Sequence, residues 1–163
     1  MADTEDLLGD GYYKVTWCLN IANIHAPTAA ELNAGVDLQL YITKDGFNVT
    51  PDQAAVDNSS LASTGPTERG GSTAFGIELT CKRKKIPAED VAWNTLQEKQ
   101  MGFLAVRRTL PEGDAWAAGQ EAEIYPAECG KRRKQQTAAN EVQKFISKLF
   151  NHSPADDNAV VAA

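Results

Sequence analysis

Short segments of alternating apolar and polar residues, separated by turns, occupy most of the chain. In residues 35–43, Val36, Leu38, Leu40 and Ile42 alternate with more polar side chains. Because successive side chains of a strand point to opposite faces, this alternation predicts a strand with one face on a core and the other toward water or a partner.

The same design recurs in residues 73–81, where Phe75, Ile77, Leu79 and Cys81 share the predicted inward face. Further strands are expected at residues 13–21, 102–110 and 120–125. Many short alternating segments of this kind are typical of antiparallel sheets. The chain is therefore predicted to be mainly β.

Two segments are predicted to be helical. Thr28 and Glu31 form a capping-box pattern, and Gly35, expected in the left-handed conformation, should stop that helix after about two turns. A second helix is predicted from Pro87 to about Gln100, because proline and then acidic residues favour a helix start. Its predicted buried positions are Val91, Trp93 and Leu96.

Two other segments are harder to assign. Apolar spacing in residues 142–150 favours a helix, although Phe145, Ser147 and Leu149 could equally line one face of a strand. Residues 57–72 are rich in Ser, Gly and Thr and lack periodicity, which predicts a long loop of the functional or disordered kind. No repeat or interdomain linker is evident, so a single domain spanning residues 1–163 is expected, with residues 1–11 and 152–163 as extended or flexible termini.

Charge is distributed unevenly along the chain. The formal net charge is −6 and the pI is about 4.9. Residues 1–80 carry a net charge of −8, and residues 81–163 carry +2. If this asymmetry survives folding, one copy could attract another head to tail.

Basic residues gather in two runs, Lys82–Lys85 and Lys131–Lys134. A nucleic-acid patch is one interpretation, but the chain is acidic overall and no aromatic residues interleave with the runs as stacking platforms. Both runs fall at predicted strand ends, where charge costs little and blocks pairing of sheet edges. Solvated or interface charge is therefore the favoured interpretation.

Candidate catalytic chemistry is sparse. The two histidines, His25 and His152, lie outside any nucleophile motif. The three cysteines, Cys18, Cys81 and Cys129, lack the spacing of a zinc site and are expected to be reduced, partly buried thiols. No catalytic residue, metal or cofactor is predicted, and enzymatic activity is not expected. The acidic start predicts a cytosolic origin, and the chain has no apolar run long enough for a membrane anchor.

Three stretches carry a resemblance to a known family. They are APTAAELNAGVDLQLYITKDGFNV, MGFLAVRRTLPEGDAWAAGQEAEIYPAECGKRRKQ and KLFNHSPADDNAVVAA. The first stretch is similar to a family pattern of Pro-Thr, Glu-Leu, Gly and Asp-Leu followed by an Asp-Gly-Phe turn. The second stretch is similar to the Gly-aromatic-Leu-x-Val-Arg-Arg block of the same family. Over most of residues 12–163 the sequence resembles phage major tail proteins, the tube subunits of long-tailed bacterial viruses.

The resemblance implies a β-sandwich or barrel-like subunit with one flanking helix and long loops, and it makes residues 142–150 a strand. It implies hexameric rings that stack into a hollow tail tube, through which viral DNA passes without sequence-specific binding. Implied partners are other copies of the chain, the tape measure protein and the tail terminator. The implied location is the virion tail, after assembly in the host cytoplasm.

Candidate site residues follow from alternation and from this resemblance. A lumen for DNA should carry acidic and neutral side chains, because weak repulsion lets a polyanion slide. The candidates for the lumen are Asp37, Gln39, Glu78 and Thr80, whose alternative role is an ordinary solvent face. The candidates for subunit or ring interfaces are Ser63, Thr64, Glu68, Arg69, Lys82, Arg83, Lys84, Lys85, Lys131, Arg132, Arg133 and Lys134.

Two alternative functions remain open at this point. One is a different β-structured assembly component, such as a secretion-type tube ring, a tail terminator or a decoration protein. The other is a nucleic-acid-binding β domain that uses the two basic runs.

Overall fold

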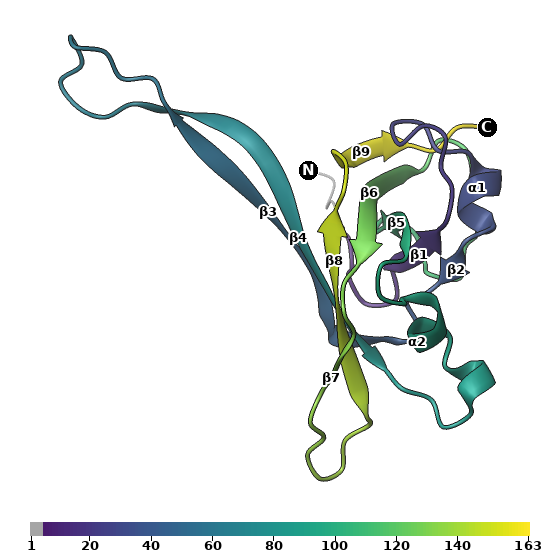
Figure 1. The fold of residues 1–163 in the computed structure, drawn as a ribbon. Helices are drawn as coiled ribbons and strands as arrows, with labels where there is room; N and C mark the ends of the chain where they lie inside the picture. The colour runs from purple at the N-terminus through teal and green to yellow at the C-terminus, as the bar shows by residue number, and fades with distance from the viewer. Residues whose placement is uncertain (1–4) are drawn as a thin grey trace.

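The strands of the described part of the chain, residues 5–163, join one antiparallel sheet in the computed structural model (Figure 1). Along the sheet the order is β2-β1-β5-β6-β8-β4-β3, with β9 beside β6 and β7 beside β8. The sheet curls without closing into a barrel, and the prediction of a mainly antiparallel β fold is confirmed. The strands are β1 Lys14–Cys18, β2 Val36–Asp37, β3 Ile42–Asp57, β4 Glu68–Lys82, β5 Met101–Arg107, β6 Glu121–Cys129, β7 Arg133–Lys134, β8 Lys144–Asn151 and β9 Asp156–Val160.

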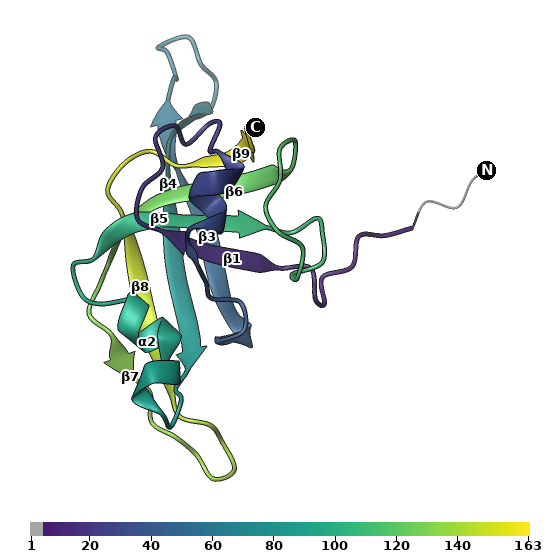
Figure 2. The same ribbon diagram turned by 90° about the vertical axis from the view of Figure 1, so that its right-hand side faces the viewer.

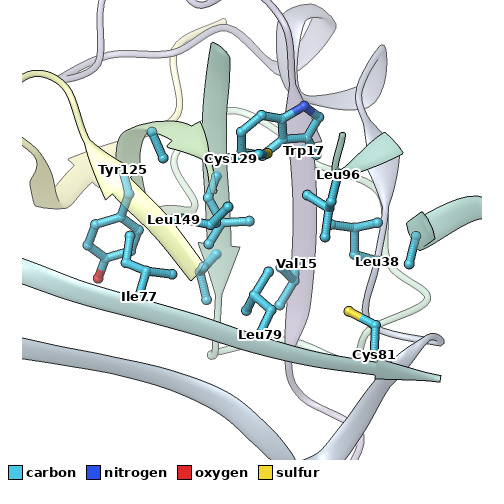
Figure 3. Close-up of a cluster of buried hydrophobic side chains, with 14 of the residues drawn as sticks. Val15, Trp17, Leu38, Ile77, Leu79, Cys81, Leu96, Tyr125, Cys129 and Leu149 are labelled. Carbon is cyan, nitrogen blue, oxygen red and sulfur yellow. The ribbon is translucent and has the colours of Figure 1, made fainter. Parts of the chain in front are cut away.

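Strands β1, β5 and β6 lie in the middle of the body and are buried on both faces. Along β5, Leu104 and Val106 point into one apolar cluster, while Phe103 and Ala105 belong to a second cluster on the opposite face. The first cluster also holds Trp17 and the side chains drawn in Figure 3. Alternating side chains of these strands therefore enter two different cores, because both faces of the strands are covered.

Strands β4 and β8 bury one face only. Ile77, Leu79 and Cys81 of β4 point into the first core, as the sequence predicts. On β8, Phe145 and Leu149 are buried in the same core, and Ser147 lies between them. Residues 142–150 therefore contain a strand, as the family resemblance implies and against the helical spacing.

The first predicted helix is confirmed as α1, Ala29–Asn33. The Glu31 backbone N–H donates to Thr28 Oγ1 at 3.2 Å, and the Thr28 N–H donates to Glu31 Oε2 at 2.9 Å. The predicted left-handed glycine is wrong, since Gly35 is not among the residues with positive φ. A Cβ there would lie 2.6 Å from Thr16 Cγ2 and 2.8 Å from the Trp17 carbonyl oxygen, so close packing on β1 requires glycine.

The second predicted helix is much shorter than expected. A 3₁₀ turn at Pro87–Glu89 precedes α2, Val91–Thr95, and the helical conformation ends there instead of near Gln100. Lys99 has a φ of 66° and its N–H donates to the Cys129 carbonyl at 2.8 Å. The helix thus ends early, and the segment after it forms a backbone hydrogen bond with β6. Leu96 is fully buried, whereas Val91 and Trp93 are only partly buried.

The strand predicted over residues 35–43 is wrong at residues 38–41, and Ile42 begins the separate strand β3. The Tyr41 N–H donates to the Leu38 carbonyl at 2.9 Å, which makes a turn where alternation indicated a strand. Leu38 is fully buried and Leu40 is 61% exposed, so the two do not share an inward face. Val36 is also exposed.

The long loop predicted over residues 57–72 is shorter than expected, because its two ends belong to strands. Strands β3 and β4 pair from Ile42 and Cys81 out to Asp57 and Glu68, so that only residues 58–67 form the connection. We call residues 51–74 the arm. It projects away from the body in both views (Figures 1 and 2), and all its residues except Gly71 are exposed.

The C-terminal segment is extended and belongs to the sheet. Strand β9 pairs with β6, and Ala159 and Val161 are buried in the second core. Of the N-terminal residues 1–11 predicted to be extended or flexible, 1–4 lie outside the described residues, and 5–11 contain no helix or strand. Within residues 5–163, every helix falls short of the length and apolar character that a membrane crossing requires.

Replacing Leu38 by alanine should test this correction of the strand pattern. Because Leu38 is fully buried, Leu38→Ala should lower the free energy of unfolding by about 2–5 kcal/mol. The matched change Leu40→Ala should alter it by less than about 0.5 kcal/mol. Urea titration followed by tryptophan fluorescence measures both, and equal losses would contradict the turn.

Candidate functional site

The fold brings the two basic runs together around Trp93 of α2. The Cζ atoms of Arg83 and Arg132 each lie 3.8 Å from the centre of the Trp93 ring. Two guanidinium groups at that height on one face would overlap, so they must lie on opposite faces of the indole. We call Arg83, Trp93 and Arg132 the Trp93 clamp.

Further contacts fix the clamp. Arg83 Nε donates to Asp90 Oδ2 at 2.6 Å, and Arg132 Nη1 donates to the Trp93 carbonyl oxygen. Phe145 of the core meets the indole edge-on, with ring centres 5.0 Å apart. Cation–π contacts of this kind stabilise by about 0.5–2 kcal/mol. The two arginines thus join the runs within one chain.

The clamp bears on the nucleic-acid alternative. The sequence shows no aromatic residue inside either run, yet the fold places Trp93 between them. With a guanidinium on each face, the indole offers no free face on which a nucleobase could stack. The remaining basic side chains of the runs are exposed, except for Lys82, which is half-buried.

The outward face of β4 and β8 carries much of this remaining positive charge. On β8 the outward positions alternate with the buried ones, and two of them, Lys144 and Lys148, lie outside the two basic runs. A shallow groove on this face has an apolar floor and a basic rim. Its lining residues are Glu78, Gly130, Lys131, Arg133, Ile146, Lys148 and Phe150. We call this groove, together with Lys82 and Lys144, the basic face.

The four lumen candidates are not gathered on one surface. Asp37 Oδ2 accepts from Lys14 Nζ at 3.1 Å and Asp37 Oδ1 accepts from Thr16 Oγ1 at 2.8 Å. Gln39 Nε2 donates to Glu112 Oε2 at 3.1 Å. Glu78 and Thr80 instead lie on β4, opposite Lys148 and Ile146 of β8. That they line a lumen stays a prediction.

The remaining interface candidates lie at the far end of the arm. Ser63 belongs to the connecting loop, where its N–H donates to the Ser60 carbonyl at 3.0 Å and its Oγ accepts from the Ser60 N–H at 2.9 Å. Thr64 follows in the same loop, and Glu68 and Arg69 begin β4. All are exposed, and their part in an interface stays a prediction.

The two histidine and cysteine predictions concern side chains away from the basic face. His25 Nδ1 lies 2.5 Å from Asp156 Oδ2, which ties the loop before α1 to β9. Cys18, Cys81 and Cys129 are free and buried, and burial raises the pKa of each thiol to about 12. Among residues 5–163, no group of three or more His, Cys, Asp or Glu side chains is placed to hold a metal ion.

The described chain is thus a curled β sheet that carries an exposed arm and a separate basic face. Over residues 1–163 the chain matches the family model described as Phage tail tube protein. It therefore belongs to the phage tail tube protein family and is a structural protein of the phage tail, which confirms the resemblance seen in the sequence.

No curated protein matches the chain in sequence. Its fold is similar to that of a chain in the cryo-EM structure of the anti-feeding prophage (AFP) baseplate, 6-fold symmetrised. The TM-score is 0.56 with 9% sequence identity, and 96% of each chain is covered. At this identity the similarity concerns the fold.

Removing one arginine of the clamp should weaken the folded state. Arg132→Gln loses the stacking on Trp93 and the bond to its carbonyl, so the free energy of unfolding should fall by about 1–2 kcal/mol. Lys131→Gln, at the exposed neighbouring position, should change it by less than about 0.5 kcal/mol. Denaturant titration compares the two, and an unchanged Arg132→Gln variant would contradict the clamp.

The three thiols should resist alkylation in the folded protein. A thiol reacts as its thiolate, and a pKa raised to about 12 leaves only about one thiolate in ten thousand at pH 8. Iodoacetamide at pH 8 should therefore label native protein very slowly and label all three cysteines in urea, as counted by mass spectrometry. Rapid labelling of a native cysteine would contradict its burial.

Proposed function

We propose that this chain self-assembles into stacked rings that form the tail tube, the conduit through which viral DNA is delivered to the host. The observation that carries this proposal is the arm. Its two strand segments pair with each other and with no other strand of the described chain, and both faces meet solvent. An isolated two-stranded hairpin is marginally stable in water, so the arm needs a surface supplied from outside its own chain.

Geometry favours other copies as that surface. The loop that connects β3 and β4 and the helix α2, which contains Trp93, lie toward opposite ends of the molecule (Figures 1 and 2). A contact between unlike patches is heterologous, and such contacts generate closed rings or open stacks according to the rotation between copies. A tube needs both closed rings and an open stack of those rings.

Six copies per ring is the proposed stoichiometry. It is supported by family membership and by the similarity in fold to a chain from a structure that was 6-fold symmetrised. The acidic net charge of −6 suits a wall that repels DNA weakly. We propose the tape measure protein and the tail terminator as further partners, with assembly in the host cytoplasm.

Electron microscopy of the purified full chain tests this function. Wild-type protein should form rings and tubes as its concentration rises, seen by negative staining and by sedimentation. A variant with residues 52–74 replaced by Asn-Gly keeps the paired base of the hairpin and should remain monomeric, because it lacks the arm.

The arm variant should retain a β-rich circular dichroism spectrum and a cooperative thermal transition, since both cores lie in the body. Wild-type protein that stays monomeric at high concentration would overturn the proposal. Rings that cap other assemblies and do not propagate would indicate a terminator or decoration protein instead.

A further inference from the structure

Two pairs of like charges face each other across neighbouring strands. Asp57 of β3 is the register partner of Glu68 of β4 at the outer end of the arm. Lys82 of β4 is the register partner of Lys144 of β8 on the basic face. In antiparallel pairs, directly opposite residues have Cβ atoms about 4.5–5.5 Å apart, and like charges at this spacing are destabilising.

Neither pair has an ion-pair partner of opposite charge among the described residues. In residues 5–163, the ion pairs do not include Asp57, Glu68, Lys82 or Lys144. Glu78, the acidic residue on the basic face, has Lys148 as its own register partner. Hydrogen bonds from the Ser59 hydroxyl and backbone N–H hold the pKa of Asp57 below its usual range, so its carboxylate stays charged at neutral pH.

Each of the two regions also exposes apolar side chains. Ser60–Ser63 form a turn closed by the hydrogen bond between the Ser63 N–H and the Ser60 carbonyl, with fully exposed Leu61 at its apex. Hydrogen bonds between Ser59 and Thr67 brace the loop below this turn. The arm tip, residues 57–68, is thus a hydrogen-bonded polar loop that presents one large apolar side chain, Leu61, with two acidic residues at its base. The groove of the basic face is its counterpart, with Ile146 and Phe150 on the floor and cationic side chains on the rim.

We propose that the arm tip of one copy docks on the basic face of the next copy, with Asp57 and Glu68 against Lys82 and Lys144 and with Leu61 in the groove. This contact rests on the proposed self-assembly and names its surfaces. Each like-charge pair, unfavourable in the single chain, gains a partner of opposite sign in the assembly. Burial of Leu61 and of the exposed Phe150 adds an apolar contribution.

Charge reversal tests the pairing, because both surfaces are present on every copy. The acid-pair variant, Asp57→Lys with Glu68→Lys, has two basic surfaces, and the base-pair variant, Lys82→Glu with Lys144→Glu, has two acidic ones. Each alone should need at least about tenfold more protein to form tubes. Mixed in equal amounts they should co-assemble near the wild-type concentration, since each tip then meets a face of opposite charge.

Two controls accompany these variants. Glu98→Lys with Glu121→Lys changes the net charge as the acid-pair variant does, at exposed positions outside both pairs, and should assemble like wild type. Circular dichroism and thermal unfolding establish that every variant is folded. Raising the salt concentration from about 0.01 M to about 1 M shortens the screening length from about 30 Å to about 3 Å and should weaken wild-type assembly.

The outcomes separate this inference from the proposed function. Wild-type tubes, poor assembly of each variant and rescue on mixing would support the docking. Wild-type tubes with variants that assemble normally, or that are not rescued by mixing, would overturn the docking and leave the tube function standing. Wild-type protein that never assembles would overturn both.

Discussion

The β3–β4 ribbon has no core beyond residue 50, and the rest of the structure is arranged around that constraint. Near the body, β4 lays Ile77, Leu79 and Cys81 on the first core and pairs with β8. Farther out, the two strands pair only with each other, and both faces of the ribbon are exposed to solvent. Ordering this segment costs conformational entropy that no burial within the chain offsets. The body, with two apolar clusters of its own, folds independently of that cost.

The distribution of charge favours one orientation of the arm relative to a neighbouring copy. The Trp93 clamp draws two basic runs, almost fifty residues apart in sequence, onto one end of the molecule. The arm tip carries an acidic pair, and the outward face of β4 and β8 carries a basic one. A structure with complementary patches in different places associates with unlike faces together, which suits rings and stacks better than a two-fold dimer. Membership of the phage tail tube protein family is consistent with this arrangement.

The sequence predicted those elements that rest on a core and missed those that do not. Alternation found β4, where the buried positions recur with period two, and the apolar content of β5 and β6 reflects burial on both of their faces. It missed the outer arm, since strands without a core have no apolar stripe to detect. It also mistook residues 38–41 for a strand, because the alternation there gives no sign of the turn, whose Tyr41 carbonyl accepts from the distant Lys82 N–H at 2.7 Å.

The candidate site was predictable to a similar extent. The basic runs were evident from the sequence, but Trp93, Asp57, Lys144 and Lys148 became relevant only through pairing across strands or loops. Arg107 shows the same limit. It is 1% exposed, and its guanidinium donates to the carbonyls of Pro111, Asp114 and Ala115, which no local pattern of side chains reveals.

Hydrogen–deuterium exchange of the arm, compared between monomeric and assembled protein, tests the central claim most directly. The claim is that the arm obtains its stabilising surface from another copy. Amides of the outer β3 and β4 segments should exchange rapidly in the monomer, because the ribbon opens readily, and become protected by orders of magnitude in assembled protein. Amides of β5 and β6 should be protected in both states. Arm amides that exchange equally fast before and after assembly, or that are already as protected as β5 in the monomer, would contradict the account.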